Sequence, residues 1–326
     1  MDNQATSNVS ATRWLAVDWG TSNLRVWAMG ANGEVLASLT SDRGMSELSP
    51  AQYEEVLIDL VKDHLAGAKP GMPLKVVICG MAGSRSGWMD AGYTDAPVNA
   101  GELSGSVVAV PTSDARIDVR ILSGLRQLDP PDVMRGEETQ LAGFATSYPG
   151  FIGHVCLPGT HSKWVSFEAS RISRNRTIMT GELFAVLREH SILAHSLPAP
   201  GEATGTLPTG AFLEGVELGY GAPGGAIGEL FLLRAGDLVG EEREPIERLA
   251  MLSGLLIGSE FAAIRPTIDI PIMFVGSERL GPLYTRAARH LGFDADAQSG
   301  DQLVLAGLKR AYELLQNADT GRQEGE

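Results

Sequence analysis

Two short segments of the chain repeat the same order of residues. In each, an apolar run leads to a turn that holds Gly, Thr and Ser, and then to a second strand-like run: residues 17–23 precede Leu24–Met29, and residues 156–162 precede 164–167. Glycine permits positive φ and close backbone approach. Successive turn N–H groups, with nearby hydroxyls, can form a concave nest for phosphate oxygens. The repeat predicts two similar halves that grip one polyphosphate from opposite sides.

The rest of the pattern alternates strands with helices. Asn32-Gly33 between two apolar runs indicates a hairpin, so residues 13–40 are expected to form a three-stranded antiparallel meander. Apolar residues at 3.6-residue spacing behind Pro50 predict a helix over 50–66. Further strands are expected at 74–79, 107–110, 118–122, 155–157, 164–167, 270–275 and 293–298. Further helices are expected at 137–146, at 180–195 with Thr180 as N-cap, at 211–235 with a glycine-rich interruption, at 246–264, from the end of the strand at 270–275 to about 291, and at 301–316.

This order, a meander followed by αβ units and then repeated, predicts an α/β fold. We expect duplicated mixed β-sheet lobes, flanked by helices, with a central cleft. The expected division is a disordered tail at 1–12, an N-terminal lobe at 13–150, a C-terminal lobe at 151–316 and a disordered tail at 317–326.

Composition narrows the class of protein. Of 326 residues, 44% are hydrophobic, which is enough for a full core, and the net charge of −14 argues against non-specific binding to nucleic acid or acidic membranes. The two cysteines, Cys79 and Cys156, lie in apolar runs and are typical of buried thiols in a reducing cytoplasm. Residues 1–12 carry no hydrophobic segment, so no signal peptide is expected, and without an 18-residue apolar run we expect no membrane span.

Asp18 and Arg25 flank the first turn. A carboxylate at the end of a buried strand, beside a phosphate nest, suits Mg²⁺, which prefers hard oxygen ligands. Arg25 could contact phosphate or carboxylate with two parallel hydrogen bonds. The plainer alternatives are an Asp that caps its own turn and a half-exposed strand Arg.

The second turn is richer in polar groups. Gly159, Thr160, His161, Ser162 and Lys163 bring two hydroxyls, an imidazole and an ammonium into six residues with Pro158. In an acidic protein such a cluster focuses positive potential on an anion. The alternative is an ordinary hairpin turn.

Glu137 and Glu138 open a helix after Gly136. Acidic residues are common at helix N-termini because they favour the dipole. The functional alternative is a general base that takes the proton from an attacking hydroxyl, or a ligand to metal-bound water.

Two further loops are candidates for ligand contact. Residues 80–88 close a buried strand with three glycines, Arg85 and Trp88, and Arg85 could hold a substrate carboxylate. Gly276 and Ser277 end a strand and open a helix, where a flat base or ribose could lie. Gly219-x-Gly221-x-x-Gly224 matches a dinucleotide fingerprint but lacks the preceding strand, so we discount it.

Five blocks in order carry a resemblance to a known family, over residues 13–316. The sequence resembles the 2-dehydro-3-deoxygalactonokinases, which belong to the actin/sugar kinase/Hsp70 superfamily with its ribonuclease H-like, two-lobed ATPase fold. The resemblance implies ATP-dependent phosphorylation of the 6-hydroxyl of 2-dehydro-3-deoxy-D-galactonate, a step in D-galactonate catabolism. The blocks are residues 18–25, 80–85, 134–140, 157–164 and 180–184.

By position, the resemblance implies a set of site residues with ATP and Mg²⁺. Asp18 would meet the metal, and Glu137 or Glu138 would be catalytic. The stretch at 136–138 is similar to a segment of exopolyphosphatases but is one residue shorter, which leaves the choice of glutamate open. The nucleotide-binding set is Gly20, Thr21, Ser22, Arg25, Gly159, Thr160, His161, Ser162, Lys163, Gly276 and Ser277, and the substrate set is Met81, Gly83, Ser84, Arg85, Trp88 and Glu182.

Other classes stay open. An exopolyphosphatase-like phosphohydrolase would share both turns and the glutamates, and a kinase for another 2-keto-3-deoxy sugar acid would differ only in its acceptor loop. A sugar-acid sensor or an actin-like filament protein are more distant alternatives. A homodimer is compatible with the sequence, and the C4 preference of the substrate is not encoded in any motif.

Overall fold

The computed structural model describes residues 11–199, 206–222, 225–266 and 269–323. The chain divides into two compact units. Unit 1 takes its residues from Met1–Phe151, Glu168–Arg174 and Gly300–Glu326, and unit 2 from Ile152–Phe167 and Asn175–Ser299. The last helix thus groups with the first unit, although it follows the second along the chain.

A six-stranded mixed sheet forms the centre of unit 1, in the order β3-β2-β1-β4-β8-β7. The first three strands form the expected antiparallel meander, and β1, β4 and β8 run parallel. The bounds are β1 Trp14–Trp19, β2 Leu24–Met29, β3 Val35–Ser41, β4 Leu74–Gly80, β7 Val107–Val110 and β8 Ile117–Leu122.

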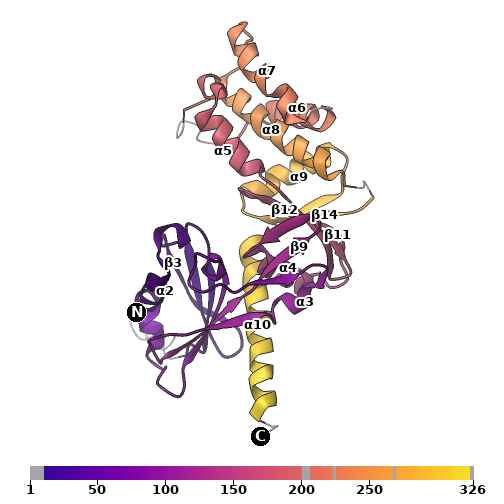
Figure 1. Ribbon diagram of the computed structural model, residues 1–326. Helices are drawn as coiled ribbons and strands as arrows, with labels where there is room; N and C mark the ends of the chain where they lie inside the picture. The colour runs from indigo at the N-terminus through magenta and orange to yellow at the C-terminus, as the bar shows by residue number, and fades with distance from the viewer. Residues whose placement is uncertain (1–10, 200–205, 223–224, 267–268, 324–326) are drawn as a thin grey trace. The chain divides into compact units, whose positions relative to one another are not determined.

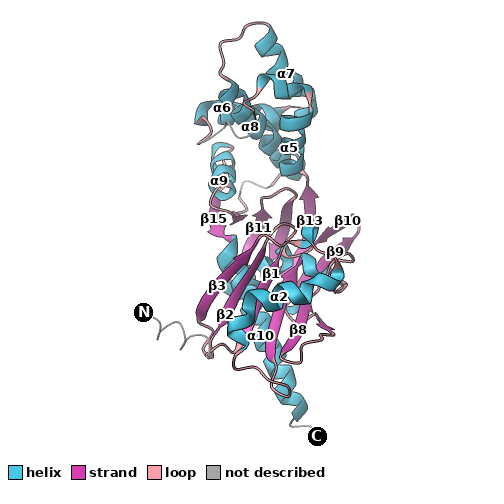
Figure 2. Ribbon diagram, turned by 90° about the vertical axis from the view of Figure 1, so that its left-hand side faces the viewer, coloured by secondary structure: helices cyan, strands magenta, loops and turns pink. Residues whose placement is uncertain are grey.

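Both faces of this sheet are covered, so alternate residues of β1 enter different cores. Leu15 and Val17 pack in the cluster that includes residues of α2 (Tyr53–Val61), while Trp14 and Ala16 pack with α10 (Gly300–Gln323). Figure 2 shows α2 lying across the near face of the sheet. Burial on both faces explains why β1 is a continuous apolar run before Asp18.

The helix α10 is longer than the sequence suggested. It was expected to end at 316 but continues to Gln323, so residues 317–323 of the expected tail are helical. A helix already formed extends easily, because each further residue fixes one hydrogen bond. It packs on α4 (Glu137–Ser147) at glycines: a Cβ at Gly143 would lie 2.0 Å from the Leu303 carbonyl oxygen. Residues 1–10 and 324–326 of the two expected tails lie outside the described residues.

A second, three-stranded sheet of unit 1 has the order β10-β9-β5. It leads the chain directly into the glycine before α4. Its strands are β5 Tyr93–Asp95, β9 Gly124–Leu128 and β10 Pro131–Met134; the short elements β6 Val98–Asn99 and α3 Ala100–Leu103 lie nearby in the chain.

The sheet of unit 2 has the order β15-β14-β11-β12-β13, and the first residues of β13, which belong to unit 1, pair with β6. The strand β14 runs parallel to both of its neighbours. The bounds are β11 Ile152–Leu157, β12 Ser162–Glu168, β13 Arg171–Ile178, β14 Ile272–Gly276 and β15 Ala295–Ser299.

Over its described residues, unit 2 also contains five helices (Figure 1): α5 Thr180–His190, α6 Thr209–Gly221, α7 Ala226–Leu238, α8 Pro245–Ile264 and α9 Leu280–His290. Glycines bring α6 and α8 together, and a Cβ at Gly219 would lie 2.1 Å from the Leu255 carbonyl oxygen. This packing accounts for Gly219 of the discounted fingerprint. The helix expected over 180–195 ends at His190 and is followed by a 3₁₀ turn at Ile192–Ser196.

Candidate active site

Asp18 lies at the end of β1, paired in register with Arg25 of β2. The Arg25 guanidinium donates to the Asp18 carboxylate and also to Asp301 on α10. Burial by itself would lower the pKa of Arg25, but the two carboxylates raise it above its ordinary value. The Cys79 Sγ at the end of β4 lies 3.8 Å from Oδ1 of Asp18. Asp18 is therefore charge-paired on one side and half-enclosed on the other.

Backbone hydrogen bonds to the carbonyl groups of the turn after Asp18 fix its conformation. Gly20 N–H closes the turn on Asn23 O at 2.8 Å, while Met45 and Ser46 N–H donate to the carbonyls of Gly20 and Thr21. Within the described residues, the N–H groups of Thr21 and Ser22 donate to no backbone carbonyl. Both residues are exposed, so these donors and the two hydroxyls are free to meet a ligand.

Two glycines with positive φ bring the next two segments together. Gly80 has φ 91° and Gly136 has φ 104°. A Cβ at Gly136 would lie 3.4 Å from the Gly80 Cα, and a Cβ at Gly80 would lie 2.6 Å from the Trp19 carbonyl oxygen and 3.3 Å from Oδ1 of Asp18. The ends of β1 and β4 and the start of α4 therefore meet at one place, as only glycine permits at these φ values.

The two glutamates of α4 differ sharply in environment. Glu138 is 1% exposed, its Oε2 accepts the Gly136 N–H at 2.6 Å, and its Oε1 accepts the Thr139 hydroxyl. Burial, reinforced by the charge of Glu137, raises the pKa of Glu138 to about 8. Glu137 is only partly buried and accepts the Arg135 N–H at 3.0 Å. Glu138 is thus neutral near pH 7, while Glu137 keeps access to solvent.

Asp18 and Glu138 approach the same buried thiol. Both carboxyl groups, after burial itself, raise the pKa of Cys79 well above its usual value. Residues far apart in the sequence, on β1 and α4, are thereby brought into one electrostatic environment in unit 1.

The loop after β4 begins with a short 3₁₀ turn, Met81–Gly83. Some of the side chains in this loop are exposed to solvent and others pack against the core. Arg85 is exposed, with its Nε 3.9 Å from Asp90. Trp88 instead packs with Tyr53 and Trp19 against the core. The Ser84 hydroxyl donates a hydrogen bond to the Met45 sulfur. A Cβ at Gly83 would lie 2.8 Å from the Arg135 guanidinium. Met81 is partly exposed on the same turn as Arg85.

The second turn, in unit 2, is buttressed by α5. A Cβ at Gly181 would lie 2.4 Å from the Gly159 carbonyl oxygen, and Glu182 N–H donates to the Thr160 carbonyl at 2.9 Å. The His161 imidazole pairs with the Glu182 carboxylate. Gly159 is partly exposed and Thr160 exposed, as a ligand-contacting turn requires.

The last two residues of the second turn point into the protein. Ser162, the first residue of β12, is fully buried and shares a 3.0 Å hydrogen bond with the Tyr284 hydroxyl. Lys163 is 8% exposed, and its Nζ donates to the Thr177 hydroxyl at 2.9 Å. The strand β12 begins at Ser162, two residues before the expected start at 164, so Ser162 and Lys163 belong to the strand and not to the turn.

The residues at the end of β14 lie beside the second turn. A Cβ at Gly276 would lie 3.5 Å from the Pro158 side chain. Ser277 Oγ accepts the N–H of Leu280, the first residue of α9. By contrast, the expected N-cap Thr180 is the first residue of α5 and uses its hydroxyl to donate to buried Glu260 instead.

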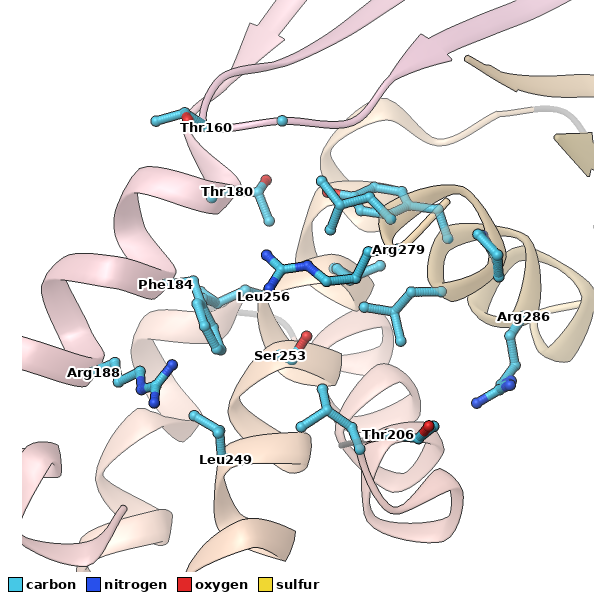
Figure 3. A pocket seen from close by; sticks show the side chains of 18 of the residues that line it. Thr160, Thr180, Phe184, Arg188, Thr206, Leu249, Ser253, Leu256, Arg279 and Arg286 are labelled. Atoms are coloured by element: carbon cyan, nitrogen blue, oxygen red, sulfur yellow. The ribbon is translucent and has the colours of Figure 1, made fainter. Parts of the chain in front are cut away.

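A cavity of ≈700 Å³ in unit 2 opens from the second turn and is lined by α5, α8 and α9 (Figure 3). Gly159 and Thr160 lie at its edge. Figure 3 shows Arg279 extending into it toward Phe184 and Leu256. In the part of the chain that the structure describes, the Arg279 guanidinium forms no ion pair. The cavity therefore combines apolar walls with the arginines Arg188, Arg279 and Arg286 and the carboxylate of Glu278.

Comparison with known proteins identifies the family. The family model described as 2-keto-3-deoxy-galactonokinase matches residues 18–311. The chain belongs to this family. A probable 2-dehydro-3-deoxygalactonokinase of Rhizobium meliloti is 41% identical over 94% of this chain and 98% of its own, and the 2-dehydro-3-deoxygalactonokinase of Escherichia coli is 33% identical over 94% and 99%. A crystal structure assigned to the same enzyme class from Sinorhizobium meliloti matches with 39% identity and a TM-score of 0.85, over 93% of this chain and 99% of that one.

Membership of the 2-keto-3-deoxy-galactonokinase family makes the chain a sugar-acid kinase, and the actin-like α/β fold class expected from the sequence is confirmed. Among the described residues, no helix is long and apolar enough to span a bilayer.

The arginines of the kinase's unit 2 cavity lie outside the five sequence blocks. Arg279 follows Ser277 by two residues, so a search for basic residues just after the strand end would have found it. Arg188 and Arg286 also line the cavity but come from α5 and α9, and no local motif marks them. Tyr284 and Glu260, which are bonded beneath the second turn, gave no signal either.

Proposed function

We propose that this kinase transfers the γ-phosphoryl group of ATP to the 6-hydroxyl of 2-dehydro-3-deoxy-D-galactonate, giving the 6-phosphate and ADP in D-galactonate catabolism. The observation that carries the proposal is the family match over residues 18–311, which spans both units and every candidate residue described above. The relatives' names favour this activity over an exopolyphosphatase-like reaction. The lobes expected at 13–150 and 151–316 are proposed as the two halves of the actin-like fold, with α10 packing on the first of them.

The nucleotide is assigned to the cavity of unit 2. Its apolar walls suit a purine, and its volume of ≈700 Å³ lies within the range of ligand sites. The base and ribose would lie by Gly276 and Ser277, near Arg279. The N–H groups of the Gly159–His161 turn would meet phosphate oxygens, while Ser162 and Lys163 would support that turn from below rather than touch the phosphates. In unit 1, the turn Gly20–Ser22 offers the same kind of donors.

The residues around Asp18 fit a magnesium ion. Asp18 offers a partly exposed carboxylate, and among the described residues no three His, Cys, Asp or Glu gather into a metal cage. One carboxylate with water and phosphate oxygens is the ligand set that Mg²⁺ takes in phosphoryl-transfer enzymes. When bound, the ion would neutralise phosphate charge. Arg25 holds Asp18 in place through their hydrogen-bonded ion pair.

Glu137 is proposed as the general base. As the 6-oxygen bonds to the γ-phosphorus and the bond to the bridging oxygen of ADP breaks, the hydroxyl proton passes to a carboxylate. Glu138, with a pKa of about 8, already holds a proton near pH 7 and cannot accept another. Glu138 instead fixes the Gly136 turn, which orients Glu137. Positioning and charge neutralisation supply most of the catalysis in such transfers.

The sugar acid is assigned to the loop after β4. Arg85 is exposed, and the one carboxylate that it approaches among the described residues, Asp90, is 3.9 Å away, so Arg85 can exchange this partner for the substrate carboxylate. Met81, Gly83 and Ser84 would shape the loop, and Trp88 would anchor it to the core. Glu182, paired with His161, is kept as a candidate for a substrate hydroxyl.

The cellular setting is also a proposal. The free thiols Cys79 and Cys156 are buried and fit a reducing cytoplasm. The net charge of −14 disfavours nucleic acid as a partner. A homodimer is proposed as the assembly, and size-exclusion chromatography with light scattering measures it directly.

One assay tests the reaction. Purified protein is incubated with Mg·ATP and 2-keto-3-deoxy acids of both C4 configurations, with no acceptor and with polyphosphate, and ADP and phosphate are followed. ADP release that depends on the galactonate-derived acid, with a 6-phosphorylated product, is expected. Phosphate release from polyphosphate, or ADP release indifferent to every sugar acid, would refute the kinase proposal; a preference for the other C4 epimer would reassign the substrate.

A further inference from the structure

Glu260 is a buried carboxylate that the proposed chemistry does not use. It lies on α8 and is 1% exposed. Trp164 Nε1 donates to its Oε1 at 2.6 Å, and the Tyr284 hydroxyl donates to its Oε2 at 2.7 Å. The Thr180 hydroxyl donates to the same Oε2, and the Cys156 thiol lies 4.0 Å from Oε1. Four groups from four elements thus converge on one side chain.

Two of these four partners lie at the wall of the proposed nucleotide cavity. Thr180 and Tyr284 line that cavity, whereas Glu260 itself does not. Figure 3 shows Thr180 close to the turn that carries Thr160. Thr180 also precedes Gly181, which packs on the Gly159 carbonyl, and Tyr284 is bonded to Ser162 at the end of the same turn. Two of the four contacts of Glu260, those with Thr180 and Tyr284, therefore lead to the second turn or the cavity wall.

Burying a carboxyl group is costly unless its oxygens are hydrogen-bonded. Burial raises the pKa of Glu260, and the hydrogen bonds from Thr180, Trp164 and Tyr284 oppose that rise. A network with all members satisfied rigidifies its surroundings, whereas one missing acceptor leaves several buried donors without partners. Glu260 therefore holds β12, α5 and α9 in one relative arrangement.

We propose that Glu260 is a positioning residue for the nucleotide: it sets the Gly159–Ser162 turn and the cavity walls at Thr180 and Tyr284 without touching the ligand. The inference rests on the proposed assignment of ATP to this cavity. It predicts that loss of Glu260 weakens nucleotide binding and leaves the sugar-acid site of unit 1 intact.

Two substitutions at this position separate charge from hydrogen bonding. In Glu260→Gln, the amide oxygen can still accept from Trp164, and the amide NH₂ can donate to the Thr180 and Tyr284 hydroxyls, which also act as acceptors. Glu260→Leu keeps the volume but satisfies none of the partners. Thr285→Val is the matched control, because Thr285 is buried on α9 and, in the part of the chain that the structure describes, its hydroxyl donates only to the Gly281 carbonyl of its own helix.

The experiment measures Mg·ADP affinity by calorimetry and the KM values of ATP and the sugar acid. Glu260→Leu is expected to weaken ADP binding and raise the ATP KM by about tenfold or more, with the sugar-acid KM within about twofold. Glu260→Gln is expected within about threefold of wild type, and Thr285→Val is expected to lower Tm without moving either KM. Should Glu260→Leu not fold, Tyr284→Phe, which removes the hydroxyl bonded to both Glu260 and Ser162, takes its place with the same expected direction.

The outcomes distinguish this inference from the proposed function. Wild-type protein that binds ADP but phosphorylates no sugar acid refutes the function, and the ADP affinities of the variants still test Glu260. An active wild type whose Glu260→Leu variant binds ADP normally, or loses both KM values equally, overturns the positioning role. Wild-type protein that binds no ADP overturns it too.

Discussion

Gly181 packs directly on Gly159: a Cβ at Gly181 would lie 2.4 Å from the Gly159 carbonyl oxygen and 2.8 Å from the Thr160 Cα. Because these are backbone atoms, no side chain can rotate away to make room. The start of α5 therefore fixes the position of the second turn, and the pair offers a direct test of that turn's role.

Gly181→Ala is expected to displace the turn and lower kcat/KM for ATP about tenfold, since overpacking a tight contact costs about 1–3 kcal/mol. Steady-state kinetics with varied ATP measure this. Gly210→Ala on α6 is the control, because a Cβ at Gly210 meets no atom within 4 Å. It should leave the kinetics unchanged and, as a Gly-to-Ala change in a helix, raise stability slightly. Equal kinetics for the two variants would remove the second turn from the nucleotide site.

Asp18→Asn is expected to lower kcat by on the order of 10²-fold or more while the fold persists, because the amide cannot supply the charge that a magnesium ion needs. Asp301→Asn is the matched control: Asp301 pairs with the same Arg25, but its side chain is 71% exposed, so it should matter little. Near-normal kcat in Asp18→Asn, with unchanged circular dichroism, would take Asp18 out of the metal site.

Glu138 is expected to make stability fall with rising pH. Its pKa is about 8 in the folded protein and near 4.5 as a free side chain, so between these pH values the folded state holds a proton that the unfolded chain has lost. Stability therefore decreases as pH rises through this window and levels off above it. In metal-free buffer, the Tm of wild type should fall from pH 5 to 8 more steeply than that of Glu138→Gln. Parallel Tm profiles would contradict the buried, protonated state.

Glu137→Gln is expected to behave in the opposite way. It should retain most of the pH dependence of Tm, since Glu138 still titrates, but should lose about 10²-fold or more in kcat if Glu137 is the base. A larger loss of kcat in Glu138→Gln than in Glu137→Gln would reverse the assignment of the two roles.

Arg279→Ala and Arg85→Ala should separate the two substrates. Arg279 extends into the cavity, so its loss should raise the ATP KM about five- to tenfold with the sugar-acid KM within about twofold. Arg85→Ala should do the reverse. Initial rates with each substrate varied in turn measure both. A rise of the ATP KM alone in Arg85→Ala would move Arg85 to the nucleotide.

Local sequence pattern predicted the elements well where a strand or helix carries its own signal. The Asn32-Gly33 hairpin and the buried run before Asp18 fix β1–β3 in sequence, because turn chemistry and two-sided burial act over a few residues. The end of α10 was missed because residues 317–323 have no apolar periodicity, although helix propagation needs none.

The sequence by itself determined the two Gly-Thr turns, the position of Asp18 at a strand end and the family, since all of these reside in contiguous residues. Tertiary structure decided the rest. It made Glu138 a buried neutral acid and left Glu137 accessible, turned Ser162 and Lys163 inward, and gathered Trp164, Thr180 and Tyr284 on Glu260. Burial and hydrogen bonding depend on which distant elements stack together, and no local spacing of residues encodes that choice.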